Sequence, residues 1–453
     1  MTGNVDDTAV LRPRLGVVVS TWSHEDGREY AAGLVDLFPK TAPLDRVELI
    51  VSPHLLEYEK DIPPLVEFFR DEAIDAVLLI PGNFTLDHVL PMAAQAIGLP
   101  TILWGIPTQE AWGALVCVHQ TLYPFFELGL PYCYVVGELG DARAWDKAIS
   151  YAQAAAIVRH LKGMRIGLMG WRAQGMSDTA FDELALREVF GVQVVNVGLT
   201  RYTRAVDAVG DIEIDQAWGE LKPGLKTEGL AEAVARYGVR SYLAMKTLAN
   251  EETLQAVTVE CFHDHLGGPC LGCSLFNDQG IAAACESDVP GALLMAAGQL
   301  LSGTPTFHVD IIKANLAENS AILHHCGNLP RRLAANPNEV ALRAIPEHVG
   351  PGAYGPTVQA TMRPGPITVV NLVGRRGTMR MCAFEGEAVP YHLEFAGSAA
   401  KAVFPFPLAQ ALEALGSRGF GHHFVVVEGH VAGIVGKWCD LLRIGFFDAG
   451  RQP

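Results

Sequence analysis

Apolar residues in the first third of the chain come in short runs that alternate with longer helical patterns. The runs are rich in Val, Ile and Leu: "LGVVVST" (15–21), "RVELIVS" (46–52), "AVLLIPG" (76–82), "PTILWG" (100–105) and "YCYVVGE" (132–138). Helical patterns, such as residues 84–97 and 109–127, lie between most of them. Strands buried on both faces read as continuous apolar runs, so this rhythm predicts βαβ units in a parallel sheet covered by helices.

The alternation of strand-like and helical segments resumes after a helix predicted over residues 141–161. Strands are predicted at 164–170 and 192–198, and helices at 178–189 and 226–237. The pattern then changes, because residues 352–395 carry turn signals every few positions and β-favouring runs such as "ITVVNLVG" and "TMRMCAF". This spacing indicates antiparallel β structure, either a barrel or a sandwich. A helix at 407–416 and a strand at 422–430 are predicted to follow.

These patterns predict an α/β fold with three domains. Two doubly wound, Rossmann-like parallel-sheet domains span residues 1–161 and 162–301, and a β-rich, mainly antiparallel domain spans 302–453. A chain of 453 residues is long enough to give each of them a core of its own.

Charge and cysteine content narrow the class of protein. The formal net charge is -16 and Lys and Arg form no cluster, which argues against binding to nucleic acid or to an anionic membrane surface. No apolar stretch reaches the roughly 18 residues that span a bilayer, and residues 1–13 do not resemble a secretion signal. Nine scattered cysteines, an odd number, are typical of reduced thiols, so we expect a cytoplasmic protein.

Two carboxylates stand at the ends of apolar runs. Glu286 follows the run 281–285 and precedes a predicted helix with Ser287 as its N-cap, and Asp310 lies within the strand-like "PTFHVDII". A buried charge costs several kcal/mol unless something pairs with it. Taken alone, Glu286 is most simply an acid favoured by the helix dipole, and Asp310 a residue of a solvated strand face.

Two histidine pairs also stand at junctions between apolar runs and turns. His324 and His325 end the run "ILHHCG", and His422 and His423 begin "HHFVVVEGH". A single histidine in such a place is usually structural. Together with two carboxylates, however, the histidines form an oxygen and imidazole donor set that suits Mn²⁺, Mg²⁺ or Co²⁺.

A second candidate metal site, rich in cysteine, is less convincing. It comprises Cys261, His263, His265, Cys270 and Cys273, and the C-x2-C spacing matches half of a zinc site. Only one such pair exists in a domain that needs no metal to fold, so packed free thiols are the preferred interpretation.

Three loops that follow predicted strands supply candidate substrate contacts. The loop "GWRAQGMSD" (170–178) lacks the spacing of a nucleotide-binding motif, and offers Arg172 and Met176 as residues lining a substrate or an interface. The loops "STWSHEDG" and "IPTQEAWG" carry Trp22 and Trp112, which can be core or interface residues or can stack on a sugar ring.

The motifs "DQGIAAACESDVPGAL" (278–292), "FHVDII" (307–312) and "ILHHCG" (322–327), with the terminal "HHFVVVEGH", resemble the L-fucose isomerase family, and more distantly the L-arabinose isomerases. The resemblance covers mainly residues 162–330 and the last histidine pair. Its most specific element is the spacing from Glu286 to Asp310, which matches the metal-binding carboxylate pair of that family. This chain is shorter than the fucose enzymes.

The resemblance implies an aldose–ketose isomerase that works by enediol proton transfer on a free pentose, hexose, 6-deoxysugar or sulfonated sugar. It implies a homo-oligomer, a trimer or hexamer, in which a neighbouring subunit helps to close each site. Glu286 and Asp310 would bind Mn²⁺ and move protons. His423, with His422 as the alternate, would be the third ligand, and His324 or His325 would lie near the metal or the substrate hydroxyls.

Two other classes of function stay open from the sequence. One is a sugar-binding or regulatory protein that keeps the fold without the chemistry. The other is a metal-dependent sugar epimerase or lyase. Metal content and product identity distinguish both from an isomerase.

Overall fold

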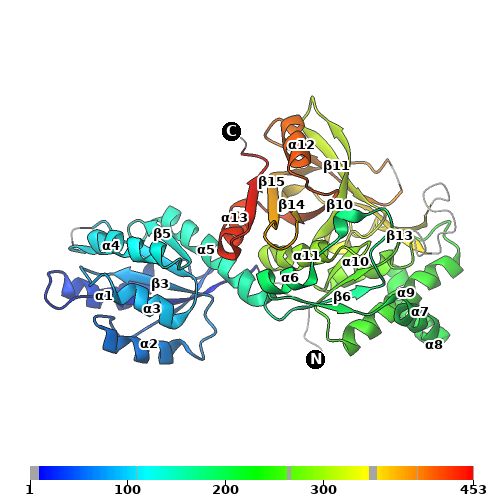
Figure 1. Cartoon of the computed structure of the whole chain (residues 1–453). Helices are drawn as coiled ribbons and strands as arrows, with labels where there is room; N and C mark the ends of the chain where they lie inside the picture. The colour runs from blue at the N-terminus through cyan, green and yellow to red at the C-terminus, as the bar shows by residue number, and fades with distance from the viewer. Residues whose placement is uncertain (1–9, 109, 263–266, 346–354, 395, 452–453) are drawn as a thin grey trace. The chain divides into compact units, whose positions relative to one another are not determined.

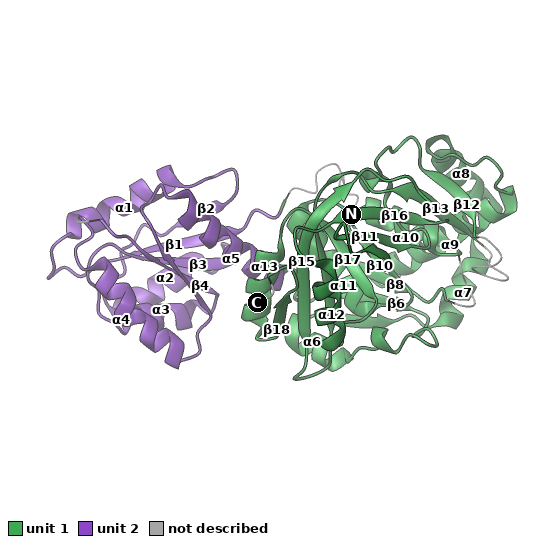
Figure 2. Cartoon of the chain, turned by 90° about the horizontal axis from the view of Figure 1, so that it is seen from above, with its two compact units in different colours: residues 1–10, 160–453 green, residues 11–159 purple. Residues whose placement is uncertain are grey.

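The computed structural model describes residues 10–108, 110–262, 267–345, 355–394 and 396–451. The chain forms two compact units, coloured separately in Figure 2: unit 2 is Leu11–Arg159, and unit 1 contains the chain from His160 onward. The finer predicted division into three domains, at residues 162 and 302, stays a prediction.

Unit 2 contains a five-stranded sheet of order β2-β1-β3-β4-β5 in which every pairing is parallel. Its strands match the predicted apolar runs: β1 Arg14–Ser20, β2 Glu48–Val51, β3 Ala76–Pro81, β4 Thr101–Gly105 and β5 Tyr132–Val136. Its helices are α1 Arg28–Thr41, α2 Ile62–Phe69, α3 Val89–Ile97, α4 Ala114–Glu127 and α5 Ala142–Leu161, with a 3₁₀ turn, η1, at Glu59–Asp61. The strand order is that of a doubly wound fold, whose ligand crevice lies where the order reverses, beyond β1 and β3.

Unit 1 begins with a second parallel sheet, of order β7-β6-β8-β9. Its strands are β6 Arg165–Met169, β7 Gln193–Asn196, β8 Ala256–Val259 and β9 Ala282–Cys285. The helices of this part are α6 Glu183–Phe190, α7 Leu199–Ala208, α8 Asp211–Leu221, α9 Glu232–Glu251, α10 Cys270–Asp278 and α11 Val289–Ser302, with 3₁₀ turns at Ser177–Thr179 (η2) and Lys222–Gly224 (η3).

Both helix predictions in this region are wrong at their starts: the helix predicted from residue 178 begins as α6 only at Glu183, after the turn η2, and the one predicted from residue 226 also begins late. Residues 226–231 are not helical, because Lys226 pairs with Ala341 as an isolated β-bridge and Gly229 adopts a left-handed φ of 79°. The helix α9 begins only at Glu232 and runs on to Glu251, and α7 and α8, which precede it, were not predicted. Figure 1 shows these three helices gathered together at one end of the unit.

The rest of unit 1 is β-rich and mainly antiparallel, as predicted. A nine-stranded sheet has the order β12-β13-β16-β11-β10-β17-β14-β15-β18, and an additional β15–β16 pairing closes its middle strands into a barrel. The strands are β10 Phe307–Asn315, β11 Ser320–His325, β12 Ala341–Ala344, β13 Pro356–Thr361, β14 Gly365–Val373, β15 Arg380–Val389, β16 Ser398–Val403, β17 His423–Glu428 and β18 Gly445–Asp448. The helices α12 Leu408–Ser417 and α13 Ala432–Leu442 and the turn η4 Arg331–Leu333 complete it.

Helix α11 connects the two parts of unit 1. It packs against β8 and β9 of the parallel sheet and against β14 and β17 of the barrel, and Figure 1 shows it between them. A helix buried on all sides is expected to be apolar all round, and "VPGALLMAAGQLLS" has only two polar side chains, Gln299 and Ser302. A side chain at Gly298 would come within 2.7 Å of Val427, so glycine permits this close approach. The C-terminal half of α11 is therefore packed closely against β17 of the barrel.

Asn277 holds this packing together through a fully satisfied buried amide. Its Nδ2 donates to the carbonyls of Cys273 and Ala283, both at 2.9 Å. Its Oδ1 accepts from the backbone N–H of Ala283 at 3.1 Å and from Gln299 Nε2 at 3.0 Å. We expect Asn277→Ala to lower the free energy of unfolding by about 3 kcal/mol, because it leaves several buried polar groups unpaired.

Chemical denaturation monitored by circular dichroism measures this effect. The matched control is the exposed Asn250 at the end of α9, where Asn250→Ala should change the free energy of unfolding by less than about 0.5 kcal/mol. Equal costs for the two variants would contradict the role given to Asn277.

Among the described residues, no helix has both the length and the apolar composition needed to cross a membrane.

Candidate active site

A strained turn carries Glu286 from the end of β9 to the start of α11. Glu286 and Ser287 have φ angles of 60° and 58°, a left-handed conformation that costs a residue with a side chain roughly 1–2 kcal/mol. The turn is held by Ser287, whose N–H donates to Val259 O at 3.2 Å and whose hydroxyl donates to Trp171 O at 2.5 Å. Strain of this kind collects at functional sites.

The turn changes which residue caps the helix. The predicted N-cap, Ser287, is wrong, because its hydroxyl is committed to Trp171. Asp288 is the N-cap, and its Oδ1 accepts from the N–H of Gly291 at 2.9 Å.

The barrel presents its polar residues to this turn from two paired strands. In the antiparallel register of β10 and β17, Asp310 lies opposite His423 and His308 opposite Val425. Side chains two residues apart on a strand point to the same face. His308, Asp310 and His423 therefore share the face of the sheet that the start of α11 approaches.

Glu286, Asp288 and His423 form a buried chain of contacts. His423 Nε2 lies 2.8 Å from Glu286 Oε2, and His423 Nδ1 lies 3.1 Å from Asp288 Oδ2. His308 Nε2 contacts the same Asp288 Oδ2 at 3.0 Å. The ring of His325 lies 5.1 Å from that of His308 and 5.9 Å from that of His423. Each of these side chains is almost fully buried.

His422, the alternate metal ligand predicted from the sequence, contacts Asp178 in the loop 170–178. Its ring Nδ1 lies 2.5 Å from Asp178 Oδ2, and its backbone N–H donates to the same oxygen at 3.1 Å. The His422 side chain is 42% exposed, whereas that of His423 is 6% exposed. Asp178 ends the loop 170–178, so this loop is tied to the barrel beside the buried cluster.

Two groups of ligand atoms converge closely enough to hold a cation. Glu286, His422 and His423 form one, His308, His325 and His423 the other, and within each group the atoms lie within 4.8 Å of one another. Asp310 belongs to neither group. Its Oδ1 is nevertheless buried without a hydrogen-bond partner in the described structure, as are both ring nitrogens of His325 and Nδ1 of His308.

The surroundings of Glu286 and Asp310 shift the pKa values of these two carboxylates in opposite directions. Burial alone would raise the pKa of Glu286, but the hydrogen bond to His423 and the nearby imidazoles lower it to about 2. Burial raises the pKa of Asp310, and the positive charge of His423 offsets this only in part. Burial alone would lower the pKa of His423, but hydrogen bonds to Asp288 and Glu286 raise it to about 10. Burial lowers the pKa of His325 well below its usual value.

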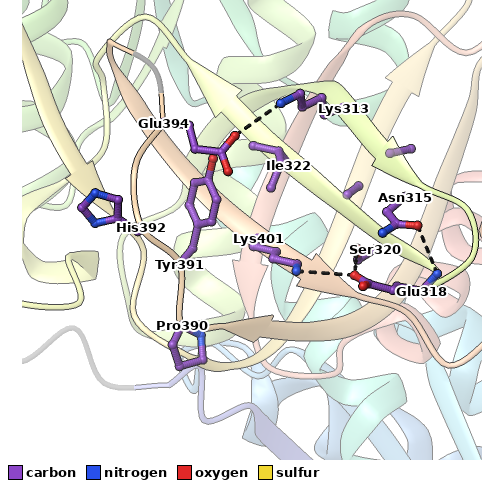
Figure 3. Close-up of a pocket in the computed structure, with 12 residues that line it drawn as sticks. Lys313, Asn315, Glu318, Ser320, Ile322, Pro390, Tyr391, His392, Glu394 and Lys401 are labelled. Atoms are coloured by element: carbon purple, nitrogen blue, oxygen red, sulfur yellow. Dashed lines mark hydrogen bonds and ion pairs between the residues drawn. The ribbon is translucent and has the colours of Figure 1, made fainter.

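A cavity of about 350 Å³ reaches the barrel side of this cluster, and Asp310 and His422 are among the residues that line it. A second cavity, of about 500 Å³, lies further along the β10–β11 hairpin (Figure 3). There Lys313 pairs with Glu394 at 3.3 Å and Lys401 with Glu318 at 3.6 Å. Because none of the residues with converging ligand atoms lines it and its lysines are already paired, it is not the candidate active site.

The other substrate residues predicted in unit 1 lie at different places around this cluster. Of the first histidine pair, His325 joins the cluster, whereas Nε2 of His324 lies 2.8 Å from the carbonyl of Ala396. Arg172 is exposed and lines a separate cavity of about 280 Å³ with Trp171 and others. Met176 is half-buried at the start of the turn η2.

The two predicted tryptophans lie in unit 2, beyond the carboxyl ends of its strands. The backbone N–H of Trp22 donates to Oδ1 of the buried Asn83 at 2.9 Å, and the N–H of Phe84 donates to the carbonyl of Trp112 at 3.1 Å. Trp112 is 61% exposed and Trp22 half-buried, its ring 5.8 Å from that of Phe84. Both therefore stand near the crevice that the strand order of unit 2 creates.

The rival cysteine site gains no support from the described residues. All nine cysteines are free. The contact with Cys285 and burial raise the pKa of Cys261 well above its usual value, and burial does the same for Cys270. Protonated, packed thiols do not suit zinc. The two histidines of that set, His263 and His265, lie outside the described residues.

Three polar residues of the cluster were not predicted as site residues: Asp178, Asp288 and His308. Asp288 carries a signal in the sequence, because it is a second acid at the same predicted helix start. His308 carries one too, because it stands two positions before Asp310 in the same predicted strand and so shares its face. Nothing local marks Asp178, whose contact with His422 spans 244 positions of the chain.

Comparisons with known proteins point to sugar isomerases. No protein-family model matches the chain. A sulfoquinovose isomerase of Alkalicoccus urumqiensis is 24% identical over 404 residues, 85% of this chain and 87% of that protein. One of Clostridium sp. (strain MSTE9) is 28% identical over 388 residues, 81% of this chain and 85% of that protein. An L-arabinose isomerase of Mycolicibacterium smegmatis is 30% identical, over 113 residues covering 25% of this chain and 22% of its own.

The chain is thus similar over most of its length to proteins named as sugar isomerases. The finer resemblance to L-fucose isomerases stays a prediction.

The solved structures found to be similar do not bear on the fold or the ligand of this chain. An ABC transporter solute-binding protein of Agrobacterium vitis, bound with alpha-D-tagatopyranose, is 13% identical and covers 65% of this chain and 90% of its own, with a TM-score of 0.17. One of Actinobacillus succinogenes 130z, with bound D-allose, is 15% identical and covers 64% and 92%, also with a TM-score of 0.17. Scores this low support no conclusion about fold or ligand.

Proposed function

We propose that this protein is a metal-dependent aldose–ketose isomerase that acts on a free sugar by enediol proton transfer. The observation that carries the proposal is the buried contact of Glu286 with His423, with Asp310 opposite His423 in the register of β10 and β17. Because relatives over most of the chain are named sulfoquinovose isomerases, a sulfonated sugar is the first substrate to test. L-Arabinose and L-fucose follow from the remaining resemblances.

The residues of the cluster fit a divalent cation. Glu286, His423 and Asp310, with His325 beside them, offer carboxylate oxygens and imidazole nitrogens, the donors that suit Mn²⁺. Buried polar atoms without partners are costly, and Asp310 Oδ1 and both ring nitrogens of His325 are such atoms among the described residues. A bound cation would give a partner to Asp310 Oδ1 and to one ring nitrogen of His325, and would balance the two buried carboxylates. It would also supply Lewis-acid polarisation of two substrate oxygens.

The protein's own residues would handle the protons. In the conversion of an aldose to a ketose, one proton moves from C2 to C1 and another from O2 to O1. Asp310 lines a cavity and its carboxylate has a free oxygen in the described structure, so it would carry the carbon-bound proton. Glu286, held in place by its contact with His423, would carry the second negative charge of the site. It would also assist the transfer of the proton from O2 to O1.

Ketose formation from a panel of aldoses tests the proposal. Protein reconstituted with Mn²⁺ should convert at least one of sulfoquinovose, L-arabinose and L-fucose to its ketose. Chelation should abolish the conversion, and added Mn²⁺ should restore it. Sugar binding without any turnover would instead favour a binding protein, and cleavage of a carbon–carbon bond would favour a lyase.

A further inference from the structure

Asp288 makes more contacts than a helix cap requires. Its Oδ1 accepts from the Gly291 N–H at 2.9 Å, which is the capping bond. Its Oδ2 lies 3.0 Å from His308 Nε2 and 3.1 Å from His423 Nδ1, so a single oxygen serves two imidazoles. The residue is 5% exposed, and a carboxylate so buried needs such partners.

The surrounding backbone is shaped around these bonds. The left-handed turn at Glu286 and Ser287 places Asp288 at the helix start while Glu286 contacts His423 from the other side. A side chain at Gly291 would come within 2.9 Å of His308 Nε2, and closer still to Asp288 Oδ2. Glycine at this position therefore leaves the Asp288–His308 bond its room.

Histidines that bind metals commonly donate their second ring N–H to a carboxylate, which fixes the tautomer and the orientation of the ring. His423 has this arrangement, with Nδ1 toward Asp288 and Nε2 toward Glu286. A proton on Nδ1, donated to Asp288, leaves Nε2 as the nitrogen able to coordinate.

We propose that Asp288 is a positioning residue, which orients His423 for cation binding and fixes His308 beside it. The inference rests on the proposed function and adds a role outside the carboxylate pair Glu286 and Asp310. Asp288 acts through the two imidazoles and does not itself need to touch substrate.

Asp288→Asn separates this role from capping. The asparagine side chain still offers an oxygen to the Gly291 N–H, but its amide nitrogen cannot accept from an imidazole N–H. Mn²⁺ affinity, measured by titration calorimetry with MnCl₂, should fall about 10–100-fold. At saturating Mn²⁺, the kcat for ketose formation should also fall, while the KM for the sugar stays near the wild-type value.

Two further variants keep the test decisive. Asp288→Ser retains a good N-cap residue that is too short to reach the histidines, so it should fold and show the same loss of Mn²⁺ affinity. Asp182, the N-cap of α6, accepts from the Ala185 N–H at 3.0 Å and makes no hydrogen bond to a histidine among the described residues. Asp182→Asn is the matched control, and should keep wild-type Mn²⁺ affinity and kcat.

The outcomes are distinguishable. If the wild type binds Mn²⁺ and forms ketose, and Asp288→Asn does both within twofold of it, Asp288 is only a cap and the inference is overturned. If the wild type neither binds Mn²⁺ nor forms ketose from any aldose, the proposed function fails and this inference fails with it.

Discussion

Glu286→Gln should abolish isomerase activity, lowering kcat by about 10³-fold or more, and should lose most of the bound Mn²⁺. The substitution keeps the size of the side chain and one acceptor oxygen for His423. It removes the negative charge that faces the buried imidazoles of His423, His325 and His308. Metal content by mass spectrometry and ketose formation at saturating Mn²⁺ measure the two effects separately.

Glu260 provides the matched control for this variant. It follows β8 as Glu286 follows β9, at the same edge of the parallel sheet, and its Oε2 accepts from the Trp171 N–H at 2.6 Å. Glu260→Gln keeps an acceptor oxygen there, so it should change kcat by no more than about threefold. If Glu286→Gln behaved like this control, the role given to Glu286 would be wrong.

Asp310→Asn should lower kcat by about 10²–10⁴-fold, the range typical of a lost general acid–base group. Mn²⁺ affinity should fall less than in Glu286→Gln, because Asp310 lies outside both groups of converging ligand atoms. The fold should tolerate the change, since burial already raises the pKa of this carboxylate and asparagine carries no charge. Metal titration and steady-state kinetics on the same preparation separate the two effects.

The exposed Glu318, near the tip of the same hairpin, provides the control. Glu318→Gln should retain wild-type kcat and Mn²⁺ affinity. Turnover of Asp310→Asn within tenfold of the wild type would exclude Asp310 as the proton carrier.

Much of the fold could be predicted because local pattern and burial agree. Runs such as residues 15–21 and 76–82 are apolar at nearly every position, and they form β1 and β3, which are buried on both faces. The unpredicted helices α7 and α8 mix apolar and polar residues, and few of their side chains are buried: Tyr202 and Val206 in α7, Ile214 and Trp218 in α8. Their positions depend on packing against α9, which no local pattern reveals.

The candidate site could be predicted only where its residues are conspicuous. Glu286 and Asp310 stand out as charges at the ends of apolar runs, and His422 and His423 as a pair. The choice of Asp288 over Ser287 as the N-cap could not be predicted, because both residue types cap helices well. The left-handed turn at Glu286 decides between them, and it is fixed by contacts with Trp171 and Val259 that lie far away in the sequence.

The most direct test of the central claim, proton transfer by the carboxylates around Glu286 and His423, is isomerisation in deuterium oxide. Mn²⁺-loaded protein should form ketose from its aldose with solvent deuterium at C1, detected by NMR, and without fragments of the carbon chain. Glu286→Gln and Asp310→Asn should each suppress both the ketose and the exchange. Ketose that forms at the wild-type rate with no deuterium at C1, or a cleaved carbon chain, would contradict this mechanism.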